Sequence, residues 1–360
     1  MATETQIIDQ LLAFIAANSV TDDDFNALAL ELFAYQVENN APYRRFCQQR
    51  EQTVRTVKSW RHIPAVPISA FKDLTLSCCA PEEAERIFMT SGTTQENVRG
   101  KSHHPTLAVY DASMIQNFGE RVMQGTDRIR MGILFPTEDA MPNSSLAHYL
   151  ALAMREFGTE DSHYLLTDDG IDTMRLLVEL AHAEQTGEPY ALLGASYSFV
   201  HMMEALQGMG EIGFLPEGSR LMDTGGFKGQ SQEMALDDFY ARLSSTFGVP
   251  RKSCINMYGM TELSTQFYDW GNETCPSVKS GPHWIRTRAV NPLTGEDVPK
   301  GTQGVLAHCD LAHFNIVSTI LTEDAGIEVE DGFLLLGRAD GAEAKGCSMA
   351  VEEFLKAAKG

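Results

Sequence analysis

Apolar side chains recur at helical spacing in the first forty residues. One apolar stripe runs from Ile8 to Ile15 and a second from Phe25 to Tyr35, each with members three or four positions apart. Between them Thr21 is placed to cap the second helix, and Asp22 to Asp24 lie favourably in its first turn. The pattern predicts two helices at the N-terminal end.

After residue 85 short apolar runs alternate with longer helical patterns, which favours α/β layering with at least one mostly parallel sheet. From residue 301 onward the pattern indicates a small β-rich segment, so we expect an α/β body over 1–300 and a closing segment over 301–360. The predicted strands are Met131–Phe135, Ala191–Gly194, Arg220–Met222, Cys254–Met257 and Gly304–His308. The predicted helices are Ser145–Phe157, Thr173–Gln185 and Met234–Phe247.

Composition narrows the class of protein. The chain has 360 residues, and its charge of 28 − 49 = −21 argues against nucleic-acid and anionic-membrane partners. The seven cysteines are odd in number and show no C-x-x-C spacing, which fits reduced thiols in the cytoplasm better than a disulfide framework or a structural zinc site. We see no signal peptide and no apolar stretch near the ~18 residues of a membrane-spanning helix.

A hydroxyl-rich glycine loop carries the strongest local chemistry. Its backbone N–H groups and hydroxyls could face a triphosphate, with a lysine supplying positive charge. A surface turn explains the same residues, and the sequence of a Walker loop is absent. The candidate residues are Thr90, Ser91, Gly92, Thr93 and Thr94, followed by Lys101.

A second glycine turn, Asp223–Gly229, follows a predicted strand. Ligands in open α/β sheets bind beyond the carboxyl ends of strands, and Gly225 with Gly226 would let a flat ring approach the backbone. A tight strand-to-helix turn is the alternative.

The third turn, Asn256–Glu262, also follows a strand. Tyr258 offers a ring for stacking beside Gly259, Thr261 a hydroxyl, and Glu262 a carboxylate that can hold Mg²⁺ through phosphate oxygens. Alternatively, Glu262 only charges the start of a helix.

Taken in order, five motifs over residues 89–346 resemble the adenylate-forming ligase superfamily. They are Ser91–Thr94, Gly225–Gly226, Tyr258–Glu262, Thr322–Asp324 and Gly337–Asp340. Within it the chain looks like the acyl-protein synthetase (LuxE-like) branch. That closer likeness rests on Pro67–Lys72, Gly225–Gly229 and Gly346–Ser348.

The resemblance implies a large adenylating α/β domain with mixed sheets, a short β-rich C-terminal segment and a truncated mobile C-terminal domain. It assigns Ser91 to Thr94 to the ATP phosphates, Gly225, Gly226 and Tyr258 to the adenine, Thr261 to the adenylate phosphate, Glu262 to Mg²⁺, Asp324 to the ribose and Arg338 to a hinge that reaches the nucleotide. Two departures are noted: Thr94-Gln95-Glu96 replaces a glycine- and proline-containing stretch of relatives, and no motif identifies a substitute for their C-terminal catalytic lysine.

The implied reaction is ATP-dependent activation of a carboxylic acid, of the fatty class, as acyl-AMP. The acyl group then moves to a protein thiol, Cys347, and on to a partner such as an acyl reductase. Gly346 and Lys345 beside Cys347 suit a reactive thiolate, whereas a small buried side chain is the alternative. Two other functions stay open: an aryl- or acyl-CoA or carrier-protein ligase resembling phenylacetate–CoA ligase, and a non-catalytic nucleotide-binding protein.

Overall fold

The computed structural model describes residues 2–91, 99–167, 169–207, 209, 214–225 and 234–359. The chain forms two compact units. Unit 1 comprises Met1–Gln116, Met260–Thr265 and Ser280–Gly360, and unit 2 comprises Asn117–Gly259 and Gln266–Lys279. The short segment with Thr261 and Glu262 therefore belongs to unit 1, although the segments on both sides of it belong to unit 2.

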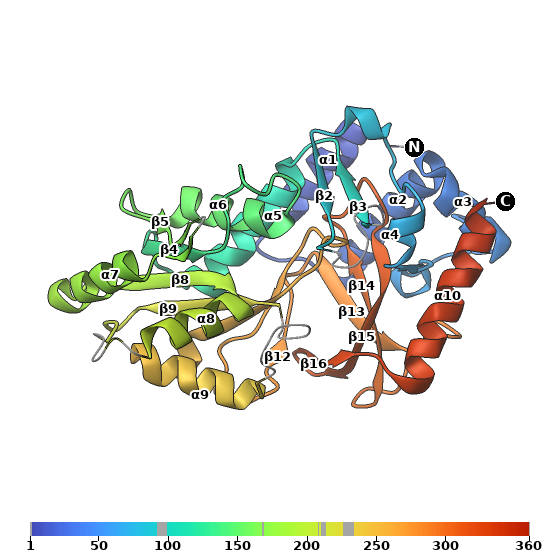
Figure 1. Ribbon diagram of the computed structural model, residues 1–360. Helices are drawn as coiled ribbons and strands as arrows, with labels where there is room; N and C mark the ends of the chain where they lie inside the picture. The colour runs from blue at the N-terminus through green and yellow to red at the C-terminus, as the bar shows by residue number, and fades with distance from the viewer. Residues whose placement is uncertain are drawn as a thin grey trace. The chain divides into compact units, whose positions relative to one another are not determined.

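Helices begin and end unit 1. Thr21 caps α2 as predicted, because its hydroxyl accepts the N–H of Asp24 while the carboxylate of Asp24 accepts the N–H of Thr21. The last helix, α10, lies beside α3 (Figure 1), and the rings of Phe46 and Phe354 meet there with centroids 4.7 Å apart. The helices are α1 Glu4–Ile15, α2 Asp22–Asn39, α3 Ala41–Gln49, η1 Trp60–His62, α4 Ala70–Asp73, η2 Pro81–Glu83, α5 Ala108–Phe118, which continues into unit 2, and α10 Gly341–Lys359.

A largely antiparallel sheet forms the centre of unit 1, with the strand order β16-β15-β14-β13 and β1 added in parallel to β15. A separate hairpin pairs β2 with β3. The strands are β1 Val66–Pro67, β2 Arg86–Met89, β3 Lys101–His104, β13 Ile285–Val290, β14 Gln303–Asp310, β15 Thr319–Val329 and β16 Gly332–Arg338.

The strands of the C-terminal β-rich segment are longer than the sequence pattern predicts. Strands β14, β15 and β16 have 8, 11 and 7 residues. Most of β14 and the first half of β15 are buried on both faces, so the apolar–polar alternation that marks a half-exposed strand is missing. Because β14 also pairs along its length with β13, residues on both sides of position 300 share one sheet.

Unit 2 is a doubly wound α/β unit whose sheet has the order β11-β10-β9-β8-β4-β5. Its neighbouring strands are parallel except for the β10–β11 pair. The strands of this sheet are β4 Arg130–Leu134, β5 His163–Tyr164, β8 Tyr190–Ala195, β9 Arg220–Thr224, β10 Cys254–Tyr258 and β11 Phe267–Tyr268. A small hairpin of β6 Leu166–Thr167 and β7 Gly170–Ile171, and the short strand β12 Val278–Lys279, lie outside this sheet. The helices of unit 2 are η3 Gly119–Met123, α6 Ser145–Phe157, α7 Thr173–Thr186, α8 Ser196–Leu206, α9 Leu236–Phe247 and η4 Arg251–Ser253.

The predicted helices and strands of unit 2 are confirmed, with boundaries within two residues. Ser144 caps α6 by accepting the N–H of Ala147. The stripe Met202, Met203 and Leu206 of α8 is buried in a core shared with α7, α9 and the sheet, as expected of a packed helix face. In the part of the chain that the structure describes, no helix is long and apolar enough to span a bilayer.

Candidate active site

Glu262 lies at the centre of the candidate site in unit 1. Its side chain is buried, with 6% exposed. A Cβ atom placed on Gly100 would lie 3.3 Å from its Oε1, 3.2 Å from Cγ2 of Thr90 and 3.4 Å from Cβ of Phe71. Thr90 just after β2, Gly100 just before β3 and Phe71 of α4 therefore lie close to this carboxyl group.

The surroundings of Glu262 place the pKa of its carboxyl group near neutral pH. Burial raises the pKa of this carboxyl group to about 7. A backbone N–H and the positive charges of Arg338 and Lys72 act in the opposite direction, whereas Glu323 raises the pKa further. A cation at this position would favour the ionised form.

Asp324 and Arg338 are neighbours in the same sheet. They face each other across β15 and β16, and Nε of Arg338 lies 3.4 Å from Oδ1 of Asp324. Nη1 of Arg338 lies 3.4 Å from Oε2 of Glu323. Two residues that the sequence assigns to one nucleotide are thus placed together, and the charge of Arg338 also acts on Glu262.

The turns assigned to adenine end adjacent parallel strands of unit 2. Gly225 follows β9 and adopts φ +89°, a conformation that favours glycine. Tyr258 ends β10, next to β9, and its mostly buried ring lies 6.0 Å from that of Phe267. With Gly259 they occupy the carboxyl edge of the sheet, where ligands of α/β folds bind.

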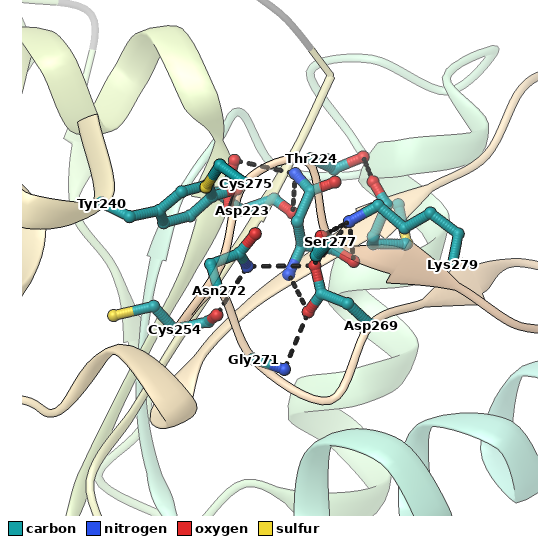
Figure 2. A network of polar contacts seen from close by, with 12 residues as sticks. Asp223, Thr224, Tyr240, Cys254, Asp269, Gly271, Asn272, Cys275, Ser277 and Lys279 are labelled. Carbon is teal, nitrogen blue, oxygen red and sulfur yellow. Dashed lines mark hydrogen bonds and ion pairs between the residues drawn. The ribbon is translucent and has the colours of Figure 1, made fainter. Parts of the chain in front are cut away.

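A buried polar network supports this edge (Figure 2). Figure 2 shows the Asp223 carboxylate beside Tyr240, whose OH donates to it at 2.9 Å. The same carboxylate accepts hydrogen bonds from Ser196 Oγ at 2.6 Å and Asn256 Nδ2 at 3.0 Å. Burial raises the pKa of Asp223 to about 6, although the hydrogen bonds from Ser196 and Tyr240 lower it. The network joins β9 and β10 just before both turns.

The hydroxyl-rich glycine loop, which is predicted to hold phosphates, is described at its two ends. Thr90 accepts the N–H of Gly100 through its hydroxyl at 3.0 Å, Ser91 is exposed, and the exposed Lys101 begins β3 opposite Met89. The other assigned positions, Gly92, Thr93 and Thr94, lie outside the described residues, and so does Gly226 of the second turn.

Cys347 lies within α10 and is buried, with 6% exposed. It packs with Val290, Val305 and Leu321, and its Sγ lies 3.8 Å from the carbonyl oxygen of Thr322. Burial raises the pKa of the thiol to about 11, and nearby Glu323 and Glu343 raise it further. In this conformation the thiol is protonated at neutral pH and covered.

Residues 11–356 match the family described as acyl-protein synthetase, LuxE. The chain belongs to this family. It is 25% identical over 304 residues to a long-chain-fatty-acid–luciferin-component ligase of Vibrio harveyi, covering 83% of this chain and 78% of that protein. A protein of the same name from Aliivibrio fischeri is 24% identical over 308 residues, covering 84% and 79%.

Solved structures show the adenylate-forming ligase fold for this LuxE-family chain. A 2-hydroxyisobutyryl-CoA ligase in complex with 2-HIB-AMP and CoA matches with a TM-score of 0.63 at 16% identity, over 87% of this chain and 74% of that one. ATP-bound MatB from Rhodopseudomonas palustris matches with a TM-score of 0.50 at 15% identity, over 72% of this chain. The chain spans about half the length of that MatB chain, 49%.

Two further residues bear on Glu262 without a role assigned from the sequence. The charge of Lys72, within Pro67–Lys72, acts on the Glu262 carboxyl group, and Asp310, which lies in no motif, accepts N–H groups of the segment just after Glu262. Four histidines of unit 1 are buried: His103, His104, His308 and His313. Among the described residues, no three His, Cys, Asp or Glu side chains gather to hold a metal ion.

Proposed function

We propose that this chain activates a long-chain fatty acid with ATP as acyl-AMP, transfers the acyl group to Cys347, and delivers it to a partner protein such as an acyl reductase. One observation carries the proposal. In a chain of the acyl-protein synthetase family, Thr90, Glu262, Asp324 and Arg338 are brought together by segments far apart in sequence. The fatty acid follows the names of the two relatives, and the protein acceptor follows the family's description as acyl-protein synthetase.

Mg²⁺ suits the donors at Glu262. Carboxylate and hydroxyl oxygens are the ligands that this ion prefers, and it commonly takes only one or two protein carboxylates together with substrate phosphates. A Cβ atom at Gly100 would fill the gap between Glu262 and Thr90, so the absence of a side chain there keeps this gap open. When bound, Mg²⁺ would offset negative charge on the phosphates.

In the first step a carboxylate oxygen of the fatty acid attacks the α-phosphorus of ATP. The bond from that phosphorus to the bridging oxygen breaks, pyrophosphate leaves and acyl-AMP remains. Within unit 1, Glu262 and Thr90 would orient the phosphates and Asp324 would accept hydrogen bonds from the ribose hydroxyls. Holding the two reactants in line supplies much of the rate enhancement.

In the second step the sulfur of Cys347 attacks the acyl carbonyl carbon and AMP leaves, which yields a thioester. The thiol must first lose its proton and its cover, because its pKa is about 11 and only 6% of the residue is exposed. A movement that exposes this part of α10 is therefore part of the proposed reaction.

The burial of Cys347 favours a second candidate, in which the acceptor is the thiol of CoA or of a carrier protein. Both candidates share the adenylation step. They differ in whether the protein itself becomes acylated.

The experiment measures ATP–pyrophosphate exchange with a panel of aliphatic and aromatic acids, and acyl label on the protein. We expect exchange with long-chain acids, about 100-fold slower in Glu262→Gln, because a neutral amide is a weaker ligand than a carboxylate for the Mg²⁺ that would offset charge on the phosphates, and losing one such stabilising group commonly costs 10²–10³-fold. Cys347→Ala should retain exchange and lose the label, whereas Cys275→Ala should retain both. Label that persists in Cys347→Ala would exclude this thiol, and silence with every acid would exclude adenylation.

A further inference from the structure

Asp310 is a fully buried carboxylate at the end of β14 that binds the segment just after Glu262. Its Oδ2 accepts the backbone N–H groups of Ser264 and Thr265, both at 2.8 Å. Its Oδ1 accepts the hydroxyl of Thr265 at 2.7 Å and the N–H of Ala312 at 3.0 Å. Asp310 has 0% exposure, so these protein donors take the place of water.

The other end of the segment is also held. The carbonyl oxygen of Thr261 accepts a hydrogen bond from Ser102 Oγ at 2.8 Å. Ser102 lies in β3, and β3 begins with Lys101, just after the phosphate loop. Glu262 therefore stands between two fixed points within unit 1.

The directions of the hydrogen bonds follow from the donors present. Thr265 gives its hydroxyl proton to Asp310, so its oxygen can only accept from its other neighbours. The single indole N–H of Trp284 lies 2.8 Å from Ser113 Oγ and 3.1 Å from Thr265 Oγ1. The Ser113 hydroxyl, 3.1 Å from Thr265 Oγ1, then donates to it, and all of these side chains are buried.

We propose that Asp310 is a positioning residue that holds the Thr261–Glu262 turn in the conformation needed for the Mg²⁺–phosphate contact. The inference rests on the proposed function, because that function assigns Glu262 its task. Both carboxylate oxygens face donors, so an amide at position 310 would turn an N–H group toward another donor. Asp310→Asn therefore changes the turn without changing the size of the side chain.

The test measures the Mg²⁺ concentration that gives half-maximal pyrophosphate exchange, and the rise in melting temperature on adding Mg²⁺ and ATP. For Asp310→Asn we expect the Mg²⁺ requirement to rise by about 10- to 100-fold, the usual effect of losing a residue that orients a metal ligand. The thermal shift should shrink as well. Thr265→Val, which removes a single hydrogen bond to Asp310, should move both readouts in the same direction by less.

Asp297→Asn is the control for a merely structural effect. Asp297 pairs with Arg61 at 2.7 Å and Arg288 at 2.8 Å in the same unit, outside the turn. It should lower stability and leave the Mg²⁺ requirement unchanged. A wild-type Mg²⁺ requirement in both Asp310→Asn and Thr265→Val, or an equal rise in Asp297→Asn, overturns the inference. Absence of exchange in the wild type overturns the proposed function instead, and the thermal shift then still decides the role of Asp310.

Discussion

Buried carboxyl groups lie at the ends of strands, or just after them, in both units. Asp223 in unit 2 and Glu262 and Asp310 in unit 1 are at most 6% exposed. Burial raises the pKa of these groups to about 6, 7 and 6 respectively. Asp223 and Asp310 are each met by several hydrogen-bond donors, which limits the cost of burying a charge. Asp223 and Asp310 each hold a turn of their own unit in one conformation, at some cost in stability.

The pKa of Asp223 predicts a pH-dependent stability. The unfolded value is about 3.9 and the folded value about 6, so between them the folded state binds more protons. This contribution is complete below the unfolded pKa and is lost as pH rises through about 6. Urea unfolding at pH 5 and pH 7.5 should show the wild type losing about 1.4 kcal/mol relative to Asp223→Asn, since about one pKa unit of the shift lies above pH 5.

Asp223→Asn is the reference for the wild type, because Glu262 and Asp310 titrate in both proteins and their contributions cancel in the comparison. Parallel changes of unfolding free energy in wild type and variant would contradict the raised pKa of Asp223.

The sequence could predict some residues of the site and not others. Glu262, Asp324 and Arg338 stand in short motifs whose order marks the superfamily. Asp310 acts through Ser264 and Thr265, some 45 residues earlier in the chain, and this pairing depends on the folded sheet. The charge of Lys72 acts on Glu262 because β1, just before Lys72, pairs with β15. No local spacing in the sequence encodes this pairing.

At the level of elements, a buried ion pair supports the end of unit 2 (Figure 2). Nζ of Lys279 lies 2.5 Å from Oδ2 of Asp269 and 3.1 Å from Ser277 Oγ. Lys279→Met should lower the free energy of unfolding by about 3–5 kcal/mol, because it leaves a buried carboxylate without its partner. Chemical denaturation measures this loss.

Lys252→Met is the matched control, because Lys252 is exposed; its effect should stay within about 0.5 kcal/mol. Adding Asp269→Asn to Lys279→Met should recover part of the loss. Equal unfolding free energies of Lys279→Met and Lys252→Met would show that the Lys279–Asp269 ion pair does not stabilise unit 2.

Gly346 sets the position of α10 beside Cys347. A Cβ on Gly346 would lie 2.6 Å from Cγ of Pro292, so Gly346→Ala must displace the helix or the loop. We expect a loss of about 1–3 kcal/mol in stability and faster alkylation of Cys347, read by mass spectrometry of its peptide. Met349→Ala, at a position 50% exposed, should alkylate at the wild-type rate. Unchanged alkylation in Gly346→Ala would contradict this role of the helix.

Regular elements were the most predictable part of the fold. Helices such as α6 and the parallel strands of unit 2 follow directly from apolar period and capping residues. The long strands β14 and β15 were underestimated, since burial on both faces and register shifts remove the alternation.

For the whole molecule, charge and chain order carry different information. The formal charge of −21 indicates an acidic exterior, yet the cations of Lys72 and Arg338 act on Glu262. The acidic exterior therefore does not describe the surroundings of Glu262. The assignment of Met260–Thr265 to unit 1 was not expected, because only long-range contacts separate this segment from its neighbours.

The most direct test of the central claim is the intact mass of the protein after incubation with ATP, Mg²⁺ and a fatty acid that supports exchange. We predict a gain of one acyl group that requires ATP, is reversed by neutral hydroxylamine and is absent from Cys347→Ala. A wild-type mass that never changes, or an acyl group that remains on Cys347→Ala, would contradict the account.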